Sequence, residues 1–234
     1  MKKRFTSDVK VIDFQPYLPQ KKQRVVTSAR NANQKEYLKK LQDDNTNIVL
    51  AIGPAGTGKT MLAVQHGIKL FQEGIVDKIV VTRPAVSVDE DLGFLPGTLN
   101  EKMAPWTRPI FDVFQEYYQQ KDIAKMLEEG VIEISPLAYM RGRTFKNSYI
   151  IADECQNTTV NQMKMLLTRL GEGSKMVVTG DLAQADRMND NGLIDFCNLL
   201  TGKNLKHIDI IEFDHRDIER HHAVKEILSI YGDS

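Results

Sequence analysis

The sequence predicts an α/β fold of three layers, in which helices cover both faces of a mainly parallel sheet. Short apolar runs alternate along the chain with helical patterns, and continuous apolar runs are typical of parallel strands buried on both faces. Polar motifs follow directly after three of these runs, and the carboxyl ends of parallel strands are where such folds bind ligands. The predicted strands are 48–52, 78–82, 131–134, 148–152, 175–179 and 207–213. The predicted helices are 59–72, 103–119, 121–129, 159–170, 192–200 and 217–231, together with an earlier one that opens at Asn33 and Gln34.

The spacing of apolar residues predicts each early element in turn. Tyr37, Leu38 and Leu41 recur at helical spacing, and a polar turn over 43–47 separates them from the first strand. The helix 59–72 has the same spacing and ends before Gly74, which is a common helix terminator.

Residues 84–135 are interpreted as a long insertion between core strands, and long insertions in α/β folds often carry function. Its aromatic residues could stack on nucleic-acid bases, but their helical spacing favours a packed core face. These residues are Trp106, Phe111, Phe114, Tyr117 and Tyr118.

The chain has 234 residues and a net charge of zero, so no global basic field points to nucleic acid. The first 30 residues are basic, with eight lysines and arginines against two aspartates. We therefore divide the chain into a basic arm, 1–29, and one domain, 30–234. The arm is either a solvated tail or a contact to phosphates or a neighbouring subunit.

The sequence shows no membrane span, no signal peptide and no disulfide pattern for Cys155 and Cys197. We therefore expect a cytoplasmic protein with reduced thiols.

The stretch from Gly53 to Thr60, Gly-Pro-Ala-Gly-Thr-Gly-Lys-Thr, lies between the first strand and a helix, as a phosphate-binding loop requires. Its glycines let backbone N–H groups point inward at anionic oxygens, and the following helix N-terminus adds positive field. Lys59 would reach the β- and γ-phosphates, and the Thr60 hydroxyl would be a magnesium ligand. The predicted nucleotide contacts are Gly53, Pro54, Ala55, Gly56, Thr57, Gly58, Lys59, Thr60 and Met61.

Two further motifs follow later strands. The strand 148–152 ends in Asp153 and Glu154, and beside a phosphate loop these carboxylates would hold magnesium and polarise the attacking water, respectively. The stretch from Gly180 to Gln184 follows the strand 175–179. Gln184 could bond the γ-phosphate or the attacking water, and the alternative is a polar turn that caps the strand.

In this combination the chain resembles the PhoH family of phosphate-starvation-inducible ATPases, which is related to the first, RecA-like motor domain of superfamily-one helicases. The resemblance spans residues 30 to 231. The Leu-Gly-Phe-Leu-Pro-Gly stretch at 92–97 and the Arg-Gly-Arg-Thr-Phe stretch at 141–145 are its most specific parts. The other matching stretches are 33–38, 53–60, 81–84, 153–157, 180–184 and 217–221.

The resemblance implies roles for several further residues. Gln34 matches the helicase glutamine that reads adenine, which implies ATP. Arg83 matches the segment that contacts single-stranded nucleic acid, whereas Arg141 and Arg143 could touch phosphates or form internal ion pairs. Arg220 matches the family's C-terminal arginine and would neutralise the γ-phosphate transition state, with Arg216 as its competitor.

These residues together predict Mg-ATP hydrolysis coupled to binding, translocation or unwinding of RNA or single-stranded DNA. Lys59, Glu154, Gln184 and Arg220 would be the catalytic set. The alternative is an ATP-dependent switch or assembly module with slow hydrolysis and a protein partner. Helicases of this type use a second motor domain to supply arginines, so we expect a homo-oligomeric ring, hypothesised to be a hexamer, in which Arg220 acts in trans.

Overall fold

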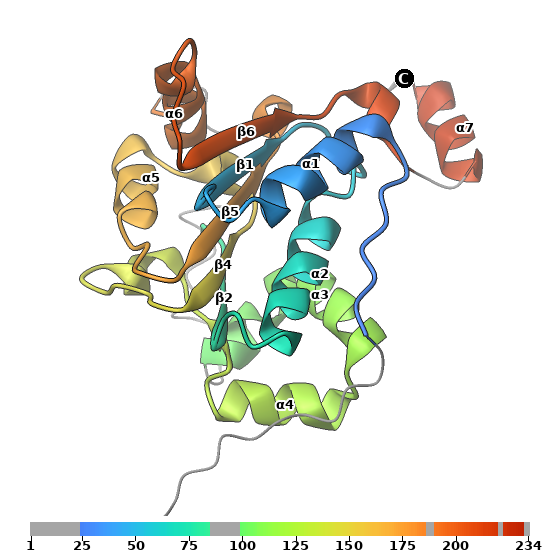
Figure 1. Cartoon of the computed structure of the whole chain (residues 1–234). Coiled ribbons are helices and arrows are strands. Elements are labelled where there is room, and N and C mark those ends of the chain that lie inside the picture. The colour runs from blue at the N-terminus through green and yellow to red at the C-terminus, as the bar shows by residue number, and fades with distance from the viewer. Residues whose placement is uncertain (1–23, 85–98, 186–189, 220–221, 232–234) are drawn as a thin grey trace, which may run out of the picture.

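The predicted α/β fold is confirmed by the computed structural model, which describes residues 24–84, 99–185, 190–219 and 222–231 (Figure 1). The described strands form one parallel sheet in the order β3-β2-β4-β5-β1-β6. Their bounds are β1 (Ile48–Ile52), β2 (Lys78–Thr82), β3 (Ile132–Ile134), β4 (Ser148–Ala152), β5 (Lys175–Gly180) and β6 (Ile208–Glu212).

Helices cover both faces of this sheet, and α7 lies at one side (Figure 1). One face carries α1 (Ala32–Gln42), α2 (Lys59–Gln72), α3 (Leu99–Tyr117) and α4 (Gln120–Glu128), and the other carries α5 (Val160–Leu167) and α6 (Gly192–Leu200). The last helix is α7 (His222–Tyr231).

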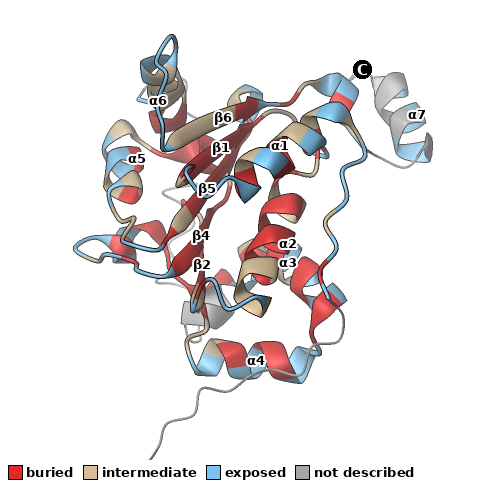
Figure 2. Ribbon diagram, in the orientation of Figure 1, coloured by how far each residue is buried: buried red, intermediate tan, exposed pale blue. Residues whose placement is uncertain are grey.

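The alternation of side chains along each strand divides the core into two layers. Val49 and Ala51 of β1 pack under α1 and α2, whereas Ile48, Leu50 and Ile52 of the same strand face α5 and α6. Figure 2 shows the resulting continuous buried layer through the middle of the sheet. The sheet therefore holds the carboxyl ends of its strands in fixed positions, where the polar motifs begin.

Three helix boundaries differ from the prediction by three residues or more. The helix α3 begins at Leu99 and runs through Pro105 and Pro109, because its apolar face packs into the core and this packing offsets the lost backbone bonds. The helix α5 ends at Leu167 rather than 170, where the Thr168 hydroxyl and the Arg169 guanidinium bond the last carbonyls instead.

The third difference concerns the start of α7, which lies at His222 rather than 217. Asp214 and Asp217 form their own capping box, in which the Asp217 carboxylate accepts from the Asp214 N–H at 2.9 Å. This separate 3-10 turn over 215–217 ends before the helix begins.

The insertion contributes directly to the main domain. Its last strand, β3, pairs with β2 and forms one edge of the sheet. Phe114, Tyr117 and Tyr118 are buried in the core, which confirms the packed-face interpretation for these residues. The Leu-Gly-Phe-Leu-Pro-Gly stretch at 92–97 lies outside the described residues.

Only residues 24–29 of the basic arm are described, and 1–23 lie outside that part of the chain. Val25 is buried, and its N–H donates to Gln72 Oε1 at 3.4 Å, so the end of the arm packs on the domain.

Both cysteines, Cys155 and Cys197, are free thiols. Within the described ranges, no helix combines the length and hydropathy that crossing a bilayer requires.

Candidate nucleotide site

The three polar motifs meet at the carboxyl ends of β1, β5 and β4, which are adjacent in the sheet. Ile52 pairs with Gly180, and the Gly53 N–H donates to the Gly180 carbonyl at 3.1 Å. The strand β5 lies between the strands that precede the phosphate loop and the paired carboxylates. The sheet thus brings together residues that are more than a hundred positions apart in the sequence.

The loop from Gly53 to Gly58 has a backbone that only glycine adopts without strain. Gly53 has φ +142°, and Gly58, just before α2, has φ +84°. A Cβ on Gly53 would run into the backbone of Phe213, which follows β6. The loop is therefore built for close approach of its backbone to the end of β6.

Lys59 is nearly buried at the start of α2, with 8% of its surface exposed. Its Nζ donates to the carbonyls of Gly53 at 2.6 Å and Pro54 at 2.7 Å. Burial lowers the pKa of Lys59, whereas the carboxylates of Asp181, Glu154 and Asp153 act to raise it. The ammonium group thus lies inside the loop and faces three carboxylates.

The predicted magnesium ligands lie in direct contact. The Thr60 hydroxyl donates to Asp153 Oδ1 at 2.7 Å, and the Thr179 hydroxyl donates to the same oxygen at 2.6 Å. A hydroxyl and a carboxylate are the hard oxygen donors that magnesium uses together with substrate phosphates. The residues present therefore fit this ion. Our sequence reasoning missed Thr179, although its place at the end of β5, just before Gly180, is a usable signal.

Glu154 has a left-handed backbone, with φ +55°, which is uncommon outside glycine and carries strain. Its carboxylate accepts from Gln156 Nε2 at 2.5 Å, and the Oε1 of the same Gln156 accepts from the Asp181 N–H at 3.2 Å. Asn191 Nδ2 in turn donates to the Gln156 carbonyl at 2.6 Å. Gln156 was also missed, and it joins the second motif to the third.

Gln34 lies against the phosphate loop and is 1% exposed. Its Nε2 donates to the Thr57 carbonyl at 3.0 Å, and its Oε1 accepts from the Arg30 N–H at 2.8 Å. These bonds fix α1 to the loop. To contact adenine, Gln34 would have to give up these two hydrogen bonds. Its role in reading adenine therefore stays a prediction.

The segment after β6 also packs on the loop. The Glu219 N–H donates to the Gly56 carbonyl at 3.0 Å, and Asn33 Nδ2 donates to Asp217 Oδ2 at 2.7 Å. Arg220 itself lies outside the described residues. Arg216 is exposed and is paired with Asp214 at 2.6 Å.

The motifs enclose a cavity of about 250 Å³ beside the loop. Gln184 is exposed in a short 3-10 turn and lines this cavity, opposite residues of the loop and of the carboxylate pair. The lining residues are Ala55, Gly56, Gly58, Lys59, Thr60, Met61, Asp153, Glu154, Thr179, Gly180, Asp181 and Gln184.

The three arginines predicted to contact nucleic acid do not form one group. Arg83 is half-buried after β2, where its Nη1 donates to the Trp106 carbonyl at 3.1 Å. Arg143 forms the internal ion pair, since both Nη atoms contact Glu133. It lines a hollow at the amino ends of β2 and β4, away from the phosphate loop. Arg141 is exposed.

Comparison with known families agrees with the geometry. Residues 26–232 match the family described as PhoH-like protein, which is nearly the whole chain. The chain belongs to this PhoH family. Its matched range includes the loop, the carboxylate pair and Gln184, so all three motifs of the site lie within the family domain.

Several curated relatives are similar to this PhoH domain over most of its length. A PhoH-like protein of Bacillus subtilis is 45% identical over 204 residues, which is 86% of this chain and 63% of that protein. A PhoH-like protein of Mycobacterium tuberculosis is 48% identical over 205 residues (87% and 57%), and Protein PhoH of Escherichia coli is 40% identical over 214 residues (87% and 58%). The chain thus spans less than two thirds of the length of these relatives.

Proposed function

We propose that this chain is an ATPase that hydrolyses Mg-ATP at the carboxyl edge of its sheet. The observation that carries the proposal is the hydrogen bond from the Thr60 hydroxyl to Asp153 Oδ1. This pair lies beside a cavity that Lys59 and Glu154 also line. A phosphate loop, a hydroxyl and two carboxylates in this arrangement are the parts that phosphoryl transfer requires.

Each of these residues has a distinct task. The Lys59 ammonium would leave the carbonyls of Gly53 and Pro54 to bind phosphate oxygens. Thr60 and Asp153 would hold magnesium, which when bound neutralises charge on the phosphates. Glu154 would accept a proton from the attacking water. Gln184, exposed on the cavity wall, would bond the γ-phosphate or that water.

The test separates binding from hydrolysis. Glu154→Gln keeps the shape of the site and removes the base, so we expect ATP binding to persist while kcat falls by about 10²–10⁴. Lys59→Ala should lose ATP binding as well. Lys164→Ala, which alters an exposed residue of α5, is the matched control and should retain both. Hydrolysis by Glu154→Gln at the unmodified rate would refute the assignment of the base.

We further propose that hydrolysis is coupled to RNA or single-stranded DNA. The support is the helicase-like pattern of the sequence, the exposed Arg141 and the basic arm. Stimulation of the ATPase rate by either nucleic acid, falling as salt rises, would favour a motor. Tight ATP binding without stimulation would favour the rival function, a nucleotide-dependent switch with a protein partner.

We also propose a homo-oligomeric ring, with a hexamer as the working hypothesis, in which Arg220 completes the site of a neighbouring subunit. The support is the resemblance to helicases that receive such arginines from a second motor domain. Glu219 bonds Gly56 of its own loop, so the experiment must separate action in trans from action in cis. Mixing Lys59→Ala and Arg220→Ala chains tests this arrangement. ATPase recovery above either variant alone supports action in trans, and no recovery or an active monomer contradicts it.

The free thiols Cys155 and Cys197 fit a reducing, cytoplasmic location.

A further inference from the structure

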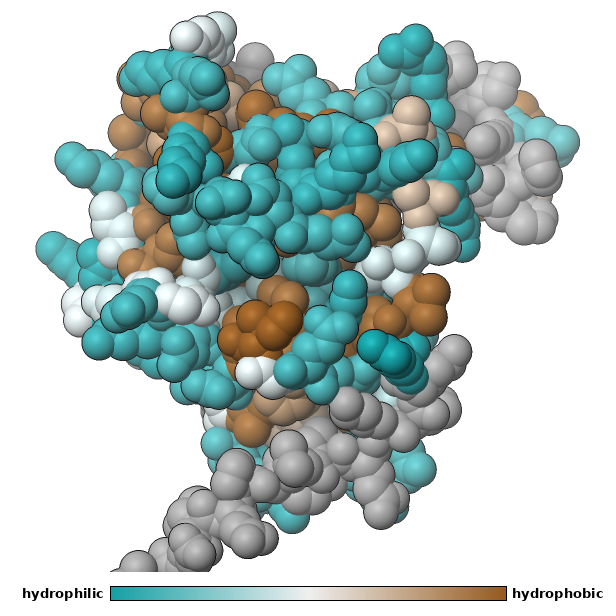
Figure 3. Space-filling view, viewed as in Figure 1, coloured by the Kyte–Doolittle hydropathy of each residue, from teal (hydrophilic) through white to brown (hydrophobic). Residues whose placement is uncertain are grey.

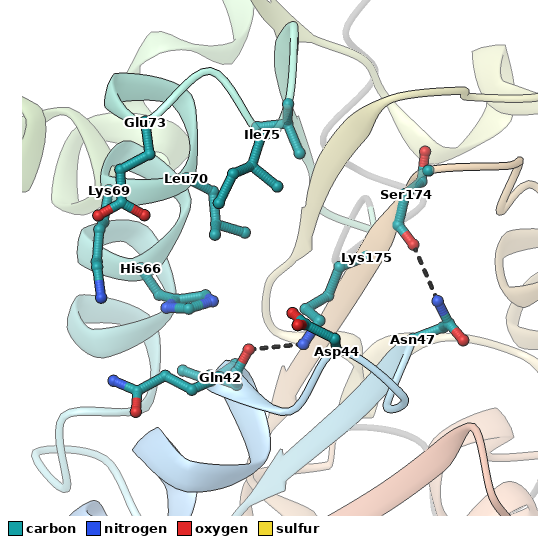
Figure 4. Close-up of a pocket in the computed structure, with 13 residues that line it drawn as sticks. Gln42, Asp44, Asn47, His66, Lys69, Leu70, Glu73, Ile75, Ser174 and Lys175 are labelled. Carbon is teal, nitrogen blue, oxygen red and sulfur yellow. Dashed lines mark hydrogen bonds between the residues drawn. The ribbon is translucent and has the colours of Figure 1, made fainter.

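A second cavity, of about 430 Å³, lies at the amino edge of the sheet, on the opposite side from the phosphate loop. The end of α1, the second half of α2 and the start of β5 form its walls (Figure 4). Its volume lies in the range of small-molecule sites, and it exceeds the volume of the nucleotide cavity. No residue of the three polar motifs lines this cavity. The helix α2, which follows the phosphate loop, is the element that both cavities share.

His66 projects from α2 into this cavity toward Lys175 (Figure 4). The side chain is only 2% exposed. The Leu41 carbonyl lies near enough to influence the ring, but neither ring nitrogen makes a hydrogen bond of normal geometry with a described residue. Buried polar groups are nearly always hydrogen-bonded, and leaving one unpaired costs roughly 1–3 kcal/mol. The hydrolytic chemistry proposed above makes no use of this histidine, so its burial without partners points to a ligand.

Two lysines act on His66. Burial lowers the pKa of His66, the charges of Lys175 and then Lys69 lower it further, and the nearby Leu41 carbonyl acts to raise it. Lys175 is held at the end of α1, where its Nζ donates to the carbonyls of Leu41 at 2.6 Å and Asp43 at 2.8 Å. The ammonium group of Lys69, one turn after His66, makes no ion pair with any described residue, although the Lys69 backbone carbonyl accepts from the Glu73 N–H.

The remaining walls are acidic at the exposed rim and apolar near the helix. Asp44 and Glu73 are exposed, whereas Leu70 is half-buried and Val76 is buried. Ile75, beside them, is 58% exposed. Figure 3 shows an apolar patch near the centre of this face, over the end of α2.

We propose that this cavity is a second binding site, for a small organic anion. Its carboxylate or phosphate group would lie between Lys69 and His66, and its apolar body would pack on Leu70 and Val76. The proposal does not depend on the proposed ATPase activity, because it rests on a different edge of the sheet. It gives Lys69 a counter-ion and His66 a hydrogen-bond partner.

Three probes that share one ring test the demand for a negative charge: benzoate, phenyl phosphate and the neutral benzamide. Each is titrated into the full chain to about 10 mM, a range that reaches weak fragment-sized binding, while NMR follows the His66 ring and the Leu70 methyls. We expect saturable shifts at these residues with the two anions and at least about tenfold weaker binding of benzamide. The tighter of the two anions assigns the site to carboxylates or to phosphate esters.

The matched variants are Lys69→Gln and Lys164→Gln. Lys69 is half-exposed on α2, and Lys164 is exposed on α5, which covers the opposite face of the sheet. Lys69→Gln should weaken anion binding about tenfold with an unchanged unfolding curve, and Lys164→Gln should bind as the unmodified chain does. The proposal is overturned if benzamide binds as tightly as benzoate or if both variants bind alike. It is equally overturned if the shifts centre on the phosphate loop, or if none of the three probes gives a saturable shift.

Discussion

At the scale of single residues, Gln156 stands between two of the three motifs. One end of its amide donates to the Glu154 carboxylate and the other accepts the Asp181 N–H, and both Gln156 and Asp181 are buried. The carboxylate that we propose as the general base is thus held by a neighbouring amide. Gln156 therefore sets the position of Glu154 and also satisfies a buried backbone group.

Replacing Gln156 with leucine would keep the side-chain volume but leave the Asp181 N–H buried and unpaired. We expect the free energy of unfolding to fall by about 1–3 kcal/mol, measured by urea denaturation. The matched control is Gln115→Leu on the exposed face of α3, which should change stability by no more than about 0.5 kcal/mol. Equal effects of the two substitutions would show that the Gln156 bonds add nothing to stability.

The buried His66 predicts a second single-residue effect, on the pH dependence of stability. Burial and the charges of Lys175 and Lys69 lower its pKa from 6.5 to about 3. Between these two pH values the unfolded chain binds a proton that the folded chain does not, so stability is lost as the pH falls. We expect His66 to account for a loss of about 2 kcal/mol between pH 7 and pH 5.

Urea unfolding at the two pH values measures this loss. A His66→Gln chain should lack it, whereas His207→Gln, which alters an exposed histidine, should keep it. If His66→Gln and the unmodified chain lose stability in parallel, the histidine is not neutral in the folded state.

At the scale of elements, α2 lies so close to β4 that one helix position admits only glycine. A Cβ on Gly67 would lie 2.5 Å from Cδ1 of Tyr149, whose ring is fully buried. Glycine to alanine in a helix usually stabilises by about 1 kcal/mol. Here we expect Gly67→Ala to destabilise by about 1–3 kcal/mol instead, because the core is overpacked.

A double-mutant cycle with Tyr149→Leu isolates this contact. The smaller side chain leaves room, so Gly67→Ala should cost at least about 1 kcal/mol less in that background, measured by urea unfolding. An equal cost in both backgrounds would place the strain elsewhere than at the tyrosine ring.

The elements also show how far the sequence predicts the structure. The strands were predicted to within two residues, because apolar runs between polar turns are a local pattern. The end of α5 was misplaced because Thr168 and Arg169 satisfy its last carbonyls, which requires knowing where those side chains turn. The continuation of α3 through Pro105 depends on core packing, which local propensity does not report.

The same limit applies to the site. Lys59, Thr60 and Asp153 belong to motifs that the sequence displays, and the structure brings them together. Thr179 and Gln156 act through contacts between strands, to Asp153 and to Asp181, and such contacts do not appear in a local pattern. For Arg143, the choice between phosphate contact and internal ion pair required the position of Glu133 on β3.

At the scale of the whole molecule, the strand before the phosphate loop depends on the far end of the described chain. Both neighbours of β1 come late in the sequence, β5 on one side and β6 on the other. Phe213 and Glu219 then cover the loop through bonds to Ile52 and Gly56. We expect a chain that stops after residue 200 to lose ATP binding, whereas a chain that stops after residue 219 should retain it.

Fluorescent-nucleotide titration measures binding by both truncated chains, with circular dichroism as the check on folding. The pair differs in β6 and the segment that follows it, so it tests these together. Nucleotide binding by the shorter chain would show that β1 is stable as an edge strand and that the loop needs no cover.

This arrangement has a consequence for synthesis on the ribosome. The phosphate loop emerges well before β5, which follows β1 by about 120 residues, and loop closure over that distance must precede pairing. A nascent chain therefore carries an apolar strand with no neighbour until β5 has been made, and we expect no nucleotide binding before that point. Since ligands that bind only the folded state stabilise it, the proposed ATP ligand would stabilise this domain only once β6 has been made.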